Sequence, residues 1–180
     1  MPGVALRALA EAHIHAVVEA CADWEELAPY GAPYWRPRSP AELQRRIAAT
    51  AGPSLASEYS LVIVEDGVLI GECSIHAIDW RNRVGEVAVC IWRPAHRGHG
   101  RGHDCLRQLM SWATGYLGLH RLEARVLTAT NRRCAWFSPW GLFTRASCVA
   151  GIWTADAGGI STCWHMSRTL KHIRHYAHVV

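Results

Sequence analysis

The stretch that most constrains this chain is Arg93–Leu109, RPAHRGHGRGHDCLRQL, which has glycine at every second position from Gly98 to Gly102. Glycine weakens any regular helix or strand, so this spacing indicates backbone that bends unusually or lets another group come very close. The residues before the glycines are typical of a strand, and those after them have helical spacing. A glycine-rich loop at a helix N-terminus directs several backbone N–H groups at one anion, so the stretch predicts a site for a phosphate-bearing ligand. The alternative is a loop that only turns a corner.

Two familiar phosphate-binding motifs do not fit these glycines. A nucleotide P-loop has the pattern GxxxxGK, and the only lysine of this chain is Lys171. A dinucleotide-binding fingerprint has the spacing GxGxxG, whereas the spacing here is GxGxG. The preceding strand is also predicted to belong to an antiparallel run, not to a βαβ unit.

Hydrophobic periodicity and turn residues predict the remaining elements. Ser39 is expected to cap a helix whose first residue is Pro40, and Asp66-Gly67 is expected to form the turn of a hairpin. The full order is strand 4–9, helix 11–22, helix 40–50, strands 59–66, 68–80 and 84–92, helix 102–117, strand 120–128, a short helix 131–143 and two further strands. This order predicts an α/β (α+β) protein with a single domain, residues 1–180. Its one mixed, mostly antiparallel central sheet is flanked by helices.

Composition narrows the class of protein. The apolar stretches are much shorter than the roughly 20 residues that cross a bilayer, so we expect no membrane association and a cytoplasmic location. The seven cysteines include no CxxC pair, which favours reduced thiols over a disulfide framework. A formal net charge of +4 suits an anionic ligand but is mild for a nucleic-acid partner, which we do not expect.

The glycine loop also carries a resemblance to a known family. Residues Arg97 to Gly102, RGHGRG, follow the pattern [RQ]-x-x-G-x-[GA] of a coenzyme A pyrophosphate loop. With the strand before it, the helix after it, LGLHRLEARV and a downstream Asn131, the region 61–143 resembles the GNAT superfamily of N-acetyltransferases, and most of all its Rim-type branch. The resemblance implies the GNAT fold, with the loop between the fourth strand and the following helix. It also implies acetyl-CoA as cofactor and transfer of the acetyl group to a primary amine.

The acceptor implied by the resemblance is a small molecule, such as an antibiotic or a metabolite, or the N-terminus of a protein or peptide. Many relatives form dimers, so a homodimer is an open alternative to a single subunit. A second interpretation of the same residues is a binding module that holds CoA or an acyl-CoA without catalysing transfer.

The resemblance assigns cofactor contacts to three parts of the chain. The loop would hold the pyrophosphate through its amides and through two arginine side chains, if these face the loop mouth. The end of the preceding strand would offer an amide to the thioester carbonyl, from Cys90 or Ile91, and Asn131 would contact the pantetheine arm or simply cap a helix. The expected cofactor residues are Cys90, Ile91, Trp92, Arg97, Gly98, His99, Gly100, Arg101, Gly102 and Asn131.

Two glutamates are the candidates for the general base that removes a proton from the acceptor. Glu86 occupies a position on the fourth strand where many relatives have an acidic residue, and Glu72 lies one strand away. Either could instead belong to a solvated face of the sheet. His76 is on the same strand as Glu72, and the alternatives for it are a half-buried structural histidine or a base.

The general acid is where this chain departs from the family pattern. Ser138 stands where many relatives carry a tyrosine, seven residues after Asn131, and Rim-type members often lack that tyrosine too. Ser138, Cys134 or water remain the alternatives.

The acceptor pocket is expected between the first two helices. Its aromatic residues Tyr30, Tyr34 and Trp35 would either line a groove for the amine or pack beneath the loop. The eleven histidines have no spacing that completes a metal-ligand set, so no metal site is expected.

Overall fold

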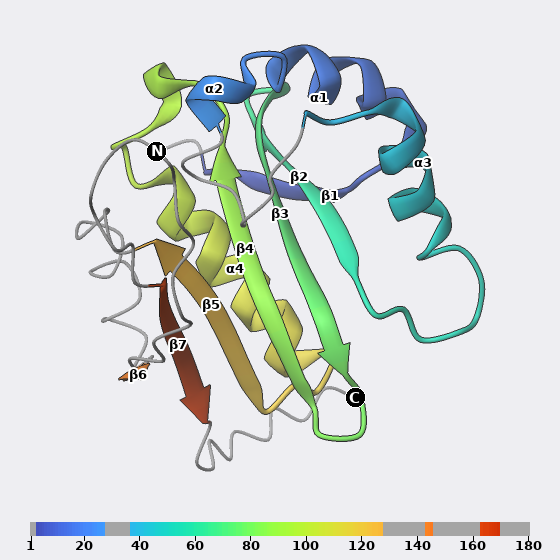
Figure 1. The fold of residues 1–180 in the computed structure, drawn as a ribbon, viewed down its shortest axis with the longest axis vertical. Coiled ribbons are helices and arrows are strands. Elements are labelled where there is room, and N and C mark those ends of the chain that lie inside the picture. The colour runs from blue at the N-terminus through green and yellow to red at the C-terminus, as the bar shows by residue number, and fades with distance from the viewer. Residues whose placement is uncertain (1–2, 28–36, 128–142, 146–162, 170–180) are drawn as a thin grey trace, which may run out of the picture.

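The computed structural model describes residues 3–27, 37–127, 143–145 and 163–169 of the 180-residue chain. These ranges contain one seven-stranded sheet (Figure 1). Its strands, in spatial order, are β1 (Ala5–Ala8), β2 (Tyr59–Glu65), β3 (Val68–Asp79), β4 (Val84–Ile91), β5 (Arg121–Leu127), β7 (Cys163–Thr169) and β6 (Phe143–Arg145).

Neighbouring strands of this sheet are antiparallel except for β4 and β5, which are parallel. The mixed, mostly antiparallel sheet expected from the sequence is therefore confirmed. The β2–β3 hairpin turns at Asp66 and Gly67, whose φ angles of 49° and 80° are both positive. Two consecutive residues with positive φ form the type I′ turn that suits the twist of a hairpin, and Asp-Gly is a preferred pair for it.

Four α-helices accompany the sheet within the described residues: α1 (Ile14–Ala20), α2 (Trp24–Leu27), α3 (Pro40–Ala48) and α4 (Arg101–Gly115). Short 3-10 turns, Glu11–His13 and Pro94–His96, precede α1 and the glycine loop. The first expected helix is thus shorter than predicted, because its initial turn is wound more tightly. Within the described residues, the structure has no helix with the length and apolar character required to cross a membrane.

Ser39 caps α3 as predicted. Its backbone is extended, its hydroxyl oxygen accepts a hydrogen bond from the Glu42 N–H at 3.2 Å, and Pro40 follows at the first helical position. This arrangement fixes the start of α3, because Ser satisfies one of the unpaired amides of the first turn and Pro has none to leave unpaired.

The sheet separates two apolar clusters. On one face α4 packs Cys105, Leu106 and Leu109 against strand residues that include Ile63 and Ile75. Figure 1 shows α4 running behind the strands.

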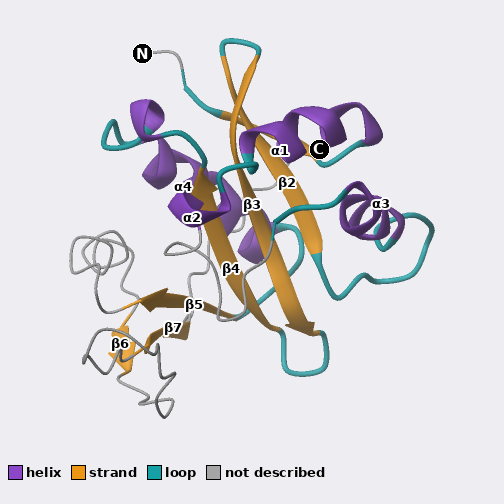
Figure 2. Cartoon of the chain, turned by 45° about the horizontal axis from the view of Figure 1, so that its top comes forward, coloured by secondary structure: helices purple, strands orange, loops and turns teal. Residues whose placement is uncertain are grey.

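On the opposite face α1 and α3 contribute Val17 and Leu43, which pack with Val62, Val64 and Trp92 of the sheet. Figure 1 shows α1, α2 and α3 at the same end of the sheet, and Figure 2 shows α1 and α3 beside β2. The remaining part of this face carries polar side chains, and it is the part that holds the candidate active site.

Candidate active site

The glycine loop after β4 has the backbone of an anion-binding cradle. Gly98 and Gly100 have φ angles of 79° and 80°, which L side chains rarely adopt, and Gly100 is the N-cap residue of α4. No side chain caps this helix, and a Cβ added at either glycine would meet no atom within 4 Å. Among the described residues, the loop therefore leaves room beside the first turn of a fifteen-residue helix, as a diphosphate requires.

The two loop arginines do not face that space. The Arg97 guanidinium donates to the Ile91 carbonyl oxygen at 2.8 Å, to the Trp92 carbonyl oxygen and to Glu26 of α2 at 2.6 Å. In this structure the guanidinium is bound to its own protein and fixes the loop, and the expected contact of Arg97 with pyrophosphate stays a prediction.

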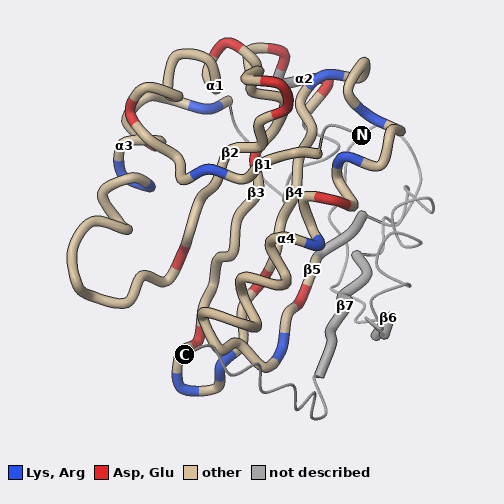
Figure 3. The backbone as a smooth tube through the Cα atoms, turned by 180° about the vertical axis from the view of Figure 1, so that it is seen from behind, with Lys and Arg blue, Asp and Glu red and all other residues tan. Residues whose placement is uncertain are grey.

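Arg101 is turned inward in the same way. Its Nε donates to the Glu65 carboxylate at 2.6 Å and its Nη1 donates to the His96 carbonyl oxygen at 3.3 Å. Hydrogen bonding from Arg101 also holds the pKa of Glu65 below its usual value. Figure 3 shows basic residues along the segment that leads into α4. His99, which is exposed, occupies the variable position of the motif between Gly98 and Gly100.

The strands β4 and β5 part at the centre of the sheet. They pair only from Val84↔Arg121 to Glu86↔Glu123, although β4 continues to Ile91 and β5 continues to Leu127. We call this divergence the fork. Beyond the fork, β4 runs toward the glycine loop, so the predicted cofactor residues on this strand and in the loop lie along one path.

The end of β4 contains the residues expected to offer an amide. The Trp92 N–H donates to the Ile70 carbonyl oxygen at 3.1 Å, so it is already engaged, and the Trp92 side chain is buried between α1, α3 and the sheet. Ile91 is buried on the α4 side and Cys90 packs on the opposite side. Trp92 therefore supports this strand end, and Cys90 and Ile91 stay the candidates for the thioester amide.

A polar surface lies on the α3 side of β3 and β4. Cross-strand pairing puts Glu72 opposite Cys90, Ser74 opposite Ala88 and His76 opposite Glu86. Directly opposite residues in an antiparallel pair share a face, so these pairs form one row that leads from the loop end of β4 to the fork.

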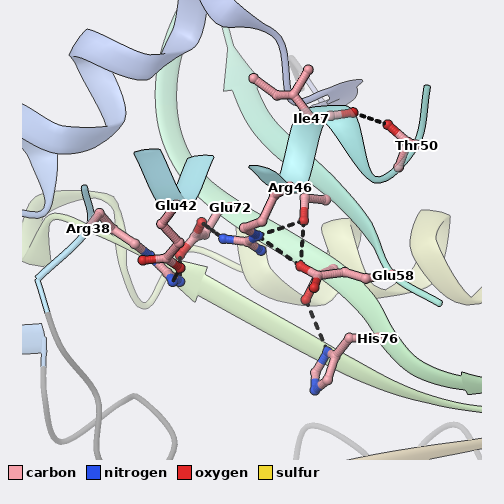
Figure 4. A network of polar contacts seen from close by, with 10 residues as sticks. Arg38, Glu42, Arg46, Ile47, Thr50, Glu58, Glu72 and His76 are labelled. Carbon is pink, nitrogen blue, oxygen red and sulfur yellow. Dashed lines mark hydrogen bonds and ion pairs between the residues drawn. The ribbon is translucent and has the colours of Figure 1, made fainter. Parts of the chain in front are cut away.

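Glu72 is held in an ion-pair cluster (Figure 4). Its two carboxylate oxygens lie 2.5 Å from Arg38 and 3.4 Å from Arg46. Arg38 also binds Glu42 at 2.7 Å, and Arg46 also binds Glu58 at 2.8 Å. The cluster joins α3 to the sheet, and both carboxylate oxygens of Glu72 are engaged by guanidinium groups.

The same cluster affects a neighbouring thiol. Burial, and next the charge of Glu72, raise the pKa of Cys21 to about 12. The Cys21 thiol therefore stays protonated and unreactive at neutral pH.

Glu86 is buried at the base of the fork. Its side chain is 11% exposed, and its Oε1 lies 3.8 Å from Nε2 of His76, whose side chain is 34% exposed. His76 Nδ1 lies 3.2 Å from the Ser74 hydroxyl oxygen. The structure thus brings together the predicted base Glu86 and a histidine to which the sequence assigned no definite role.

The other carboxylate near His76 is Glu58, drawn beside it in Figure 4. Although burial opposes the change, Arg46, Ser60 and His76 together hold the pKa of Glu58 below its usual value. Glu58, Arg38 and Arg46 were not singled out from the sequence. The i,i+4 spacing of Arg38 and Glu42 was a local signal for part of the cluster, but nothing local pointed to Glu58.

Five predicted site residues lie outside the described residues: Tyr30, Tyr34, Trp35, Asn131 and Ser138. Their assigned roles stay predictions, as does the short helix expected over 131–143. Within the part of the chain that the structure describes, no group of three or more His, Cys, Asp or Glu side chains is placed to hold a metal ion.

Comparisons with known proteins agree with this geometry. The family profile described as an acetyltransferase (GNAT) domain matches residues 4–135. No curated protein matches significantly. Among solved structures, spermidine N-acetyltransferase from Vibrio cholerae in complex with CoA and spermine is 17% identical, with a TM-score of 0.75 and coverage of 92% of this chain and 95% of that one.

Two further structures are similar over almost their whole length. A probable acetyltransferase has 17% identity, a TM-score of 0.78 and 93% coverage of both chains. A dodecameric spermidine N-acetyltransferase from Vibrio cholerae has 18% identity, a TM-score of 0.71 and coverage of 92% of this chain and 93% of that one. At these identities the likeness establishes the fold, and the profile establishes the family. The chain belongs to the GNAT family and is an acetyl-CoA-dependent N-acetyltransferase.

Proposed function

We propose that this enzyme acetylates a primary amine of a small molecule or of a peptide N-terminus, and that the amine docks on the polar surface of β3 and β4. The observation that carries the proposal is the fork. It opens toward the anion-binding loop at one end, and the His76–Glu86 pair lies at its base. A neighbour of the same fold was solved with CoA and spermine, which supports an amine as acceptor.

Bound acetyl-CoA supplies an acetyl group activated as a thioester. The residues that would hold it are the amides of Gly98 to Gly102 and the strand end at Cys90 and Ile91. The open, positive-φ glycines and the uncapped start of α4 fit a diphosphate, because helix N-terminal amides stabilise negative charge without needing a cationic side chain.

The protein has a further task on the acceptor side, which is to remove a proton from the amine. An alkylamine is an ammonium ion at neutral pH and cannot attack until it loses a proton, so a proton acceptor is needed close to the fork. Of the two predicted carboxylates, Glu72 is occupied by Arg38 and Arg46, whereas Glu86 faces the more exposed His76. Glu86 is therefore the better supported of the two for a part in the proton transfer.

The direct test is an acceptor panel with a readout of free thiol. Purified enzyme with acetyl-CoA should release CoA only when an acceptor is added, and the panel should include spermidine, an aminoglycoside and a peptide with a free N-terminus. CoA release that no acceptor stimulates would support the alternative, a module that binds CoA without transferring the acetyl group.

The loop assignment has its own test. Gly100→Glu puts a negative charge where the loop amides converge, and juxtaposed like charges cost several kcal/mol, so CoA affinity should fall by more than about 100-fold. Gly100→Ala is the matched control, because it has the same backbone strain at positive φ without the charge. If calorimetry shows that Gly100→Glu binds CoA as tightly as Gly100→Ala does, the loop is not the diphosphate site.

A further inference from the structure

The residue pair at the base of the fork is positioned by an irregularity in β3. The register between β3 and β4 shifts directly after His76↔Glu86, and Ala77 has a φ of 50°, which is rare for a residue with a side chain. An extra residue of this kind bends a strand and redirects the neighbouring side chains, and such bulges are frequent beside active sites. The bulge therefore places His76 beside the last β4 residue that pairs with β5.

The charged groups around His76 come from several elements. Glu86 of β4 lies 3.8 Å from Nε2, and Glu58, in the segment before β2, interacts with the same imidazole. Arg46 of α3 is bound to Glu58, and Glu123 of β5, opposite Glu86, is ion-paired with Arg121. A positive charge on the imidazole would thus lie beside the Glu86 carboxylate, with Glu58 as a further negative charge in its surroundings.

Exposure distinguishes His76 from the acidic groups on this surface. Its side chain is 34% exposed, against 11% for Glu86 and 13% for Glu72. Among the described groups here, Glu42, Glu58, Glu72 and Glu123 are each bound to an arginine. His76 combines access from the surface with an imidazole, which can accept a proton on one ring nitrogen while the other is hydrogen-bonded.

We propose that His76 is the catalytic base of this enzyme and that Glu86 is a positioning residue that acts through it; this assignment rests on the proposed function. The contact with Ser74 is compatible with the tautomer that this role requires: when Nδ1–H donates to the Ser74 oxygen, Nε2 keeps its lone pair. An N–H bond of the acceptor ammonium breaks, an Nε2–H bond forms, and the amine keeps the electron pair with which it attacks. The imidazolium, stabilised by Glu86 and Glu58, returns its proton to solvent before the next turnover.

The experiment compares pH–rate profiles of the wild type, His76→Gln and Glu86→Gln, with the member of the acceptor panel that the wild type acetylates fastest. A positioned general base contributes typically 10²–10⁴-fold, so His76→Gln should lower kcat/KM by at least about 100-fold. It should also lose the rise in rate near neutral pH. Glu86→Gln should keep this rise but lower kcat/KM by less than His76→Gln does, because the imidazole stays in place and loses only the neighbouring negative charge.

Three readouts separate catalysis from a structural role. CoA binding and thermal stability of His76→Gln should match those of the wild type, and added imidazole should restore part of the rate of His76→Gly. His15→Gln is the control, because His15 is 94% exposed on α1, and it should change nothing.

The assignment is wrong if His76→Gln keeps the rise near neutral pH, or if imidazole does not restore any rate to His76→Gly. A wild type that acetylates no member of the panel would instead overturn the proposed function, and the assignment of His76 with it. An active wild type with an unaffected His76→Gln overturns the assignment of His76 alone.

Discussion

Gly71 of β3 is the glycine whose replacement should disturb both the sheet and the cofactor site. A Cβ added there would meet the carbonyl oxygen of Cys90 at 2.3 Å, and the Cδ1 atoms of Ile63 and Ile91 at 3.1 Å. The first distance is roughly 1 Å shorter than the usual carbon–oxygen contact. Because this oxygen belongs to the backbone of β4, it cannot rotate away, and the strand itself must move.

The expected magnitude follows from that geometry. Overpacking costs typically about 1–3 kcal/mol, and a clash with backbone belongs at the upper end of that range. For a protein of this size each kcal/mol lowers Tm by about 2–4 °C, so Gly71→Ala should melt about 6–12 °C below the wild type. CoA affinity measured well below the melting temperature should also fall, because the displaced residue, Cys90, lies at the strand end that leads to the loop.

The matched control is Gly115→Ala at the end of α4. A Cβ at Gly115 would meet nothing within 4 Å, so this variant should be unchanged or up to about 1 kcal/mol more stable. Thermal melts followed by circular dichroism, together with calorimetry of CoA binding, measure both effects. A Gly71→Ala protein that melts within about 2 °C of the wild type would refute the claim that β3 and β4 are in rigid contact here.

Two further predictions concern α3 and its contact with the sheet. Ser39→Ala should lower the free energy of unfolding by about 0.5–2 kcal/mol, because the Glu42 amide loses its cap, and Ser39→Asp should restore most of it in the same denaturant titration. Glu58 has a folded-state pKa below its usual 4.5, so its contribution to stability is present above about pH 4.5 and is lost as the pH falls through the folded value. Melting temperatures between pH 3 and 6 should therefore fall less steeply for Glu58→Gln than for the wild type, and parallel curves would contradict this role.

Local rules were sufficient for much of the fold. The Asp66-Gly67 turn and the glycine loop depend on positive φ angles that few residues adopt, and the cap at Ser39 depends on a side-chain oxygen directly before Pro40. Each could therefore be predicted from neighbouring residues alone. The start of α4 at Arg101 is within one residue of the expected Gly102.

The side-chain partners of the site could not be predicted in this way. Arg97 and Arg101 were expected at the phosphates because they lie in the loop, but their partners Glu26 and Glu65 come from distant parts of the chain. The bulge at Ala77 likewise has no signature in the sequence. Because the bulge shifts the register between β3 and β4, the pairing of His76 with Glu86 could not be predicted from the sequence of these two strands. The homodimer, the cytoplasmic location and the lack of a nucleic-acid partner stay predictions.

The inward-facing arginines have a consequence for how the loop would recognise the diphosphate that we propose for it. Glu26 balances the charge of Arg97, and Glu65 balances the charge of Arg101. The attraction of an anion to the loop therefore depends less on these two arginines and more on the dipoles of the backbone amides. A dipole's field decays faster with distance than that of an ion, so these two side chains add little long-range steering. Selection among anions would then depend on shape, because an anion is bound well only when its oxygens contact several amides at once. Small ions such as chloride should therefore compete weakly with CoA.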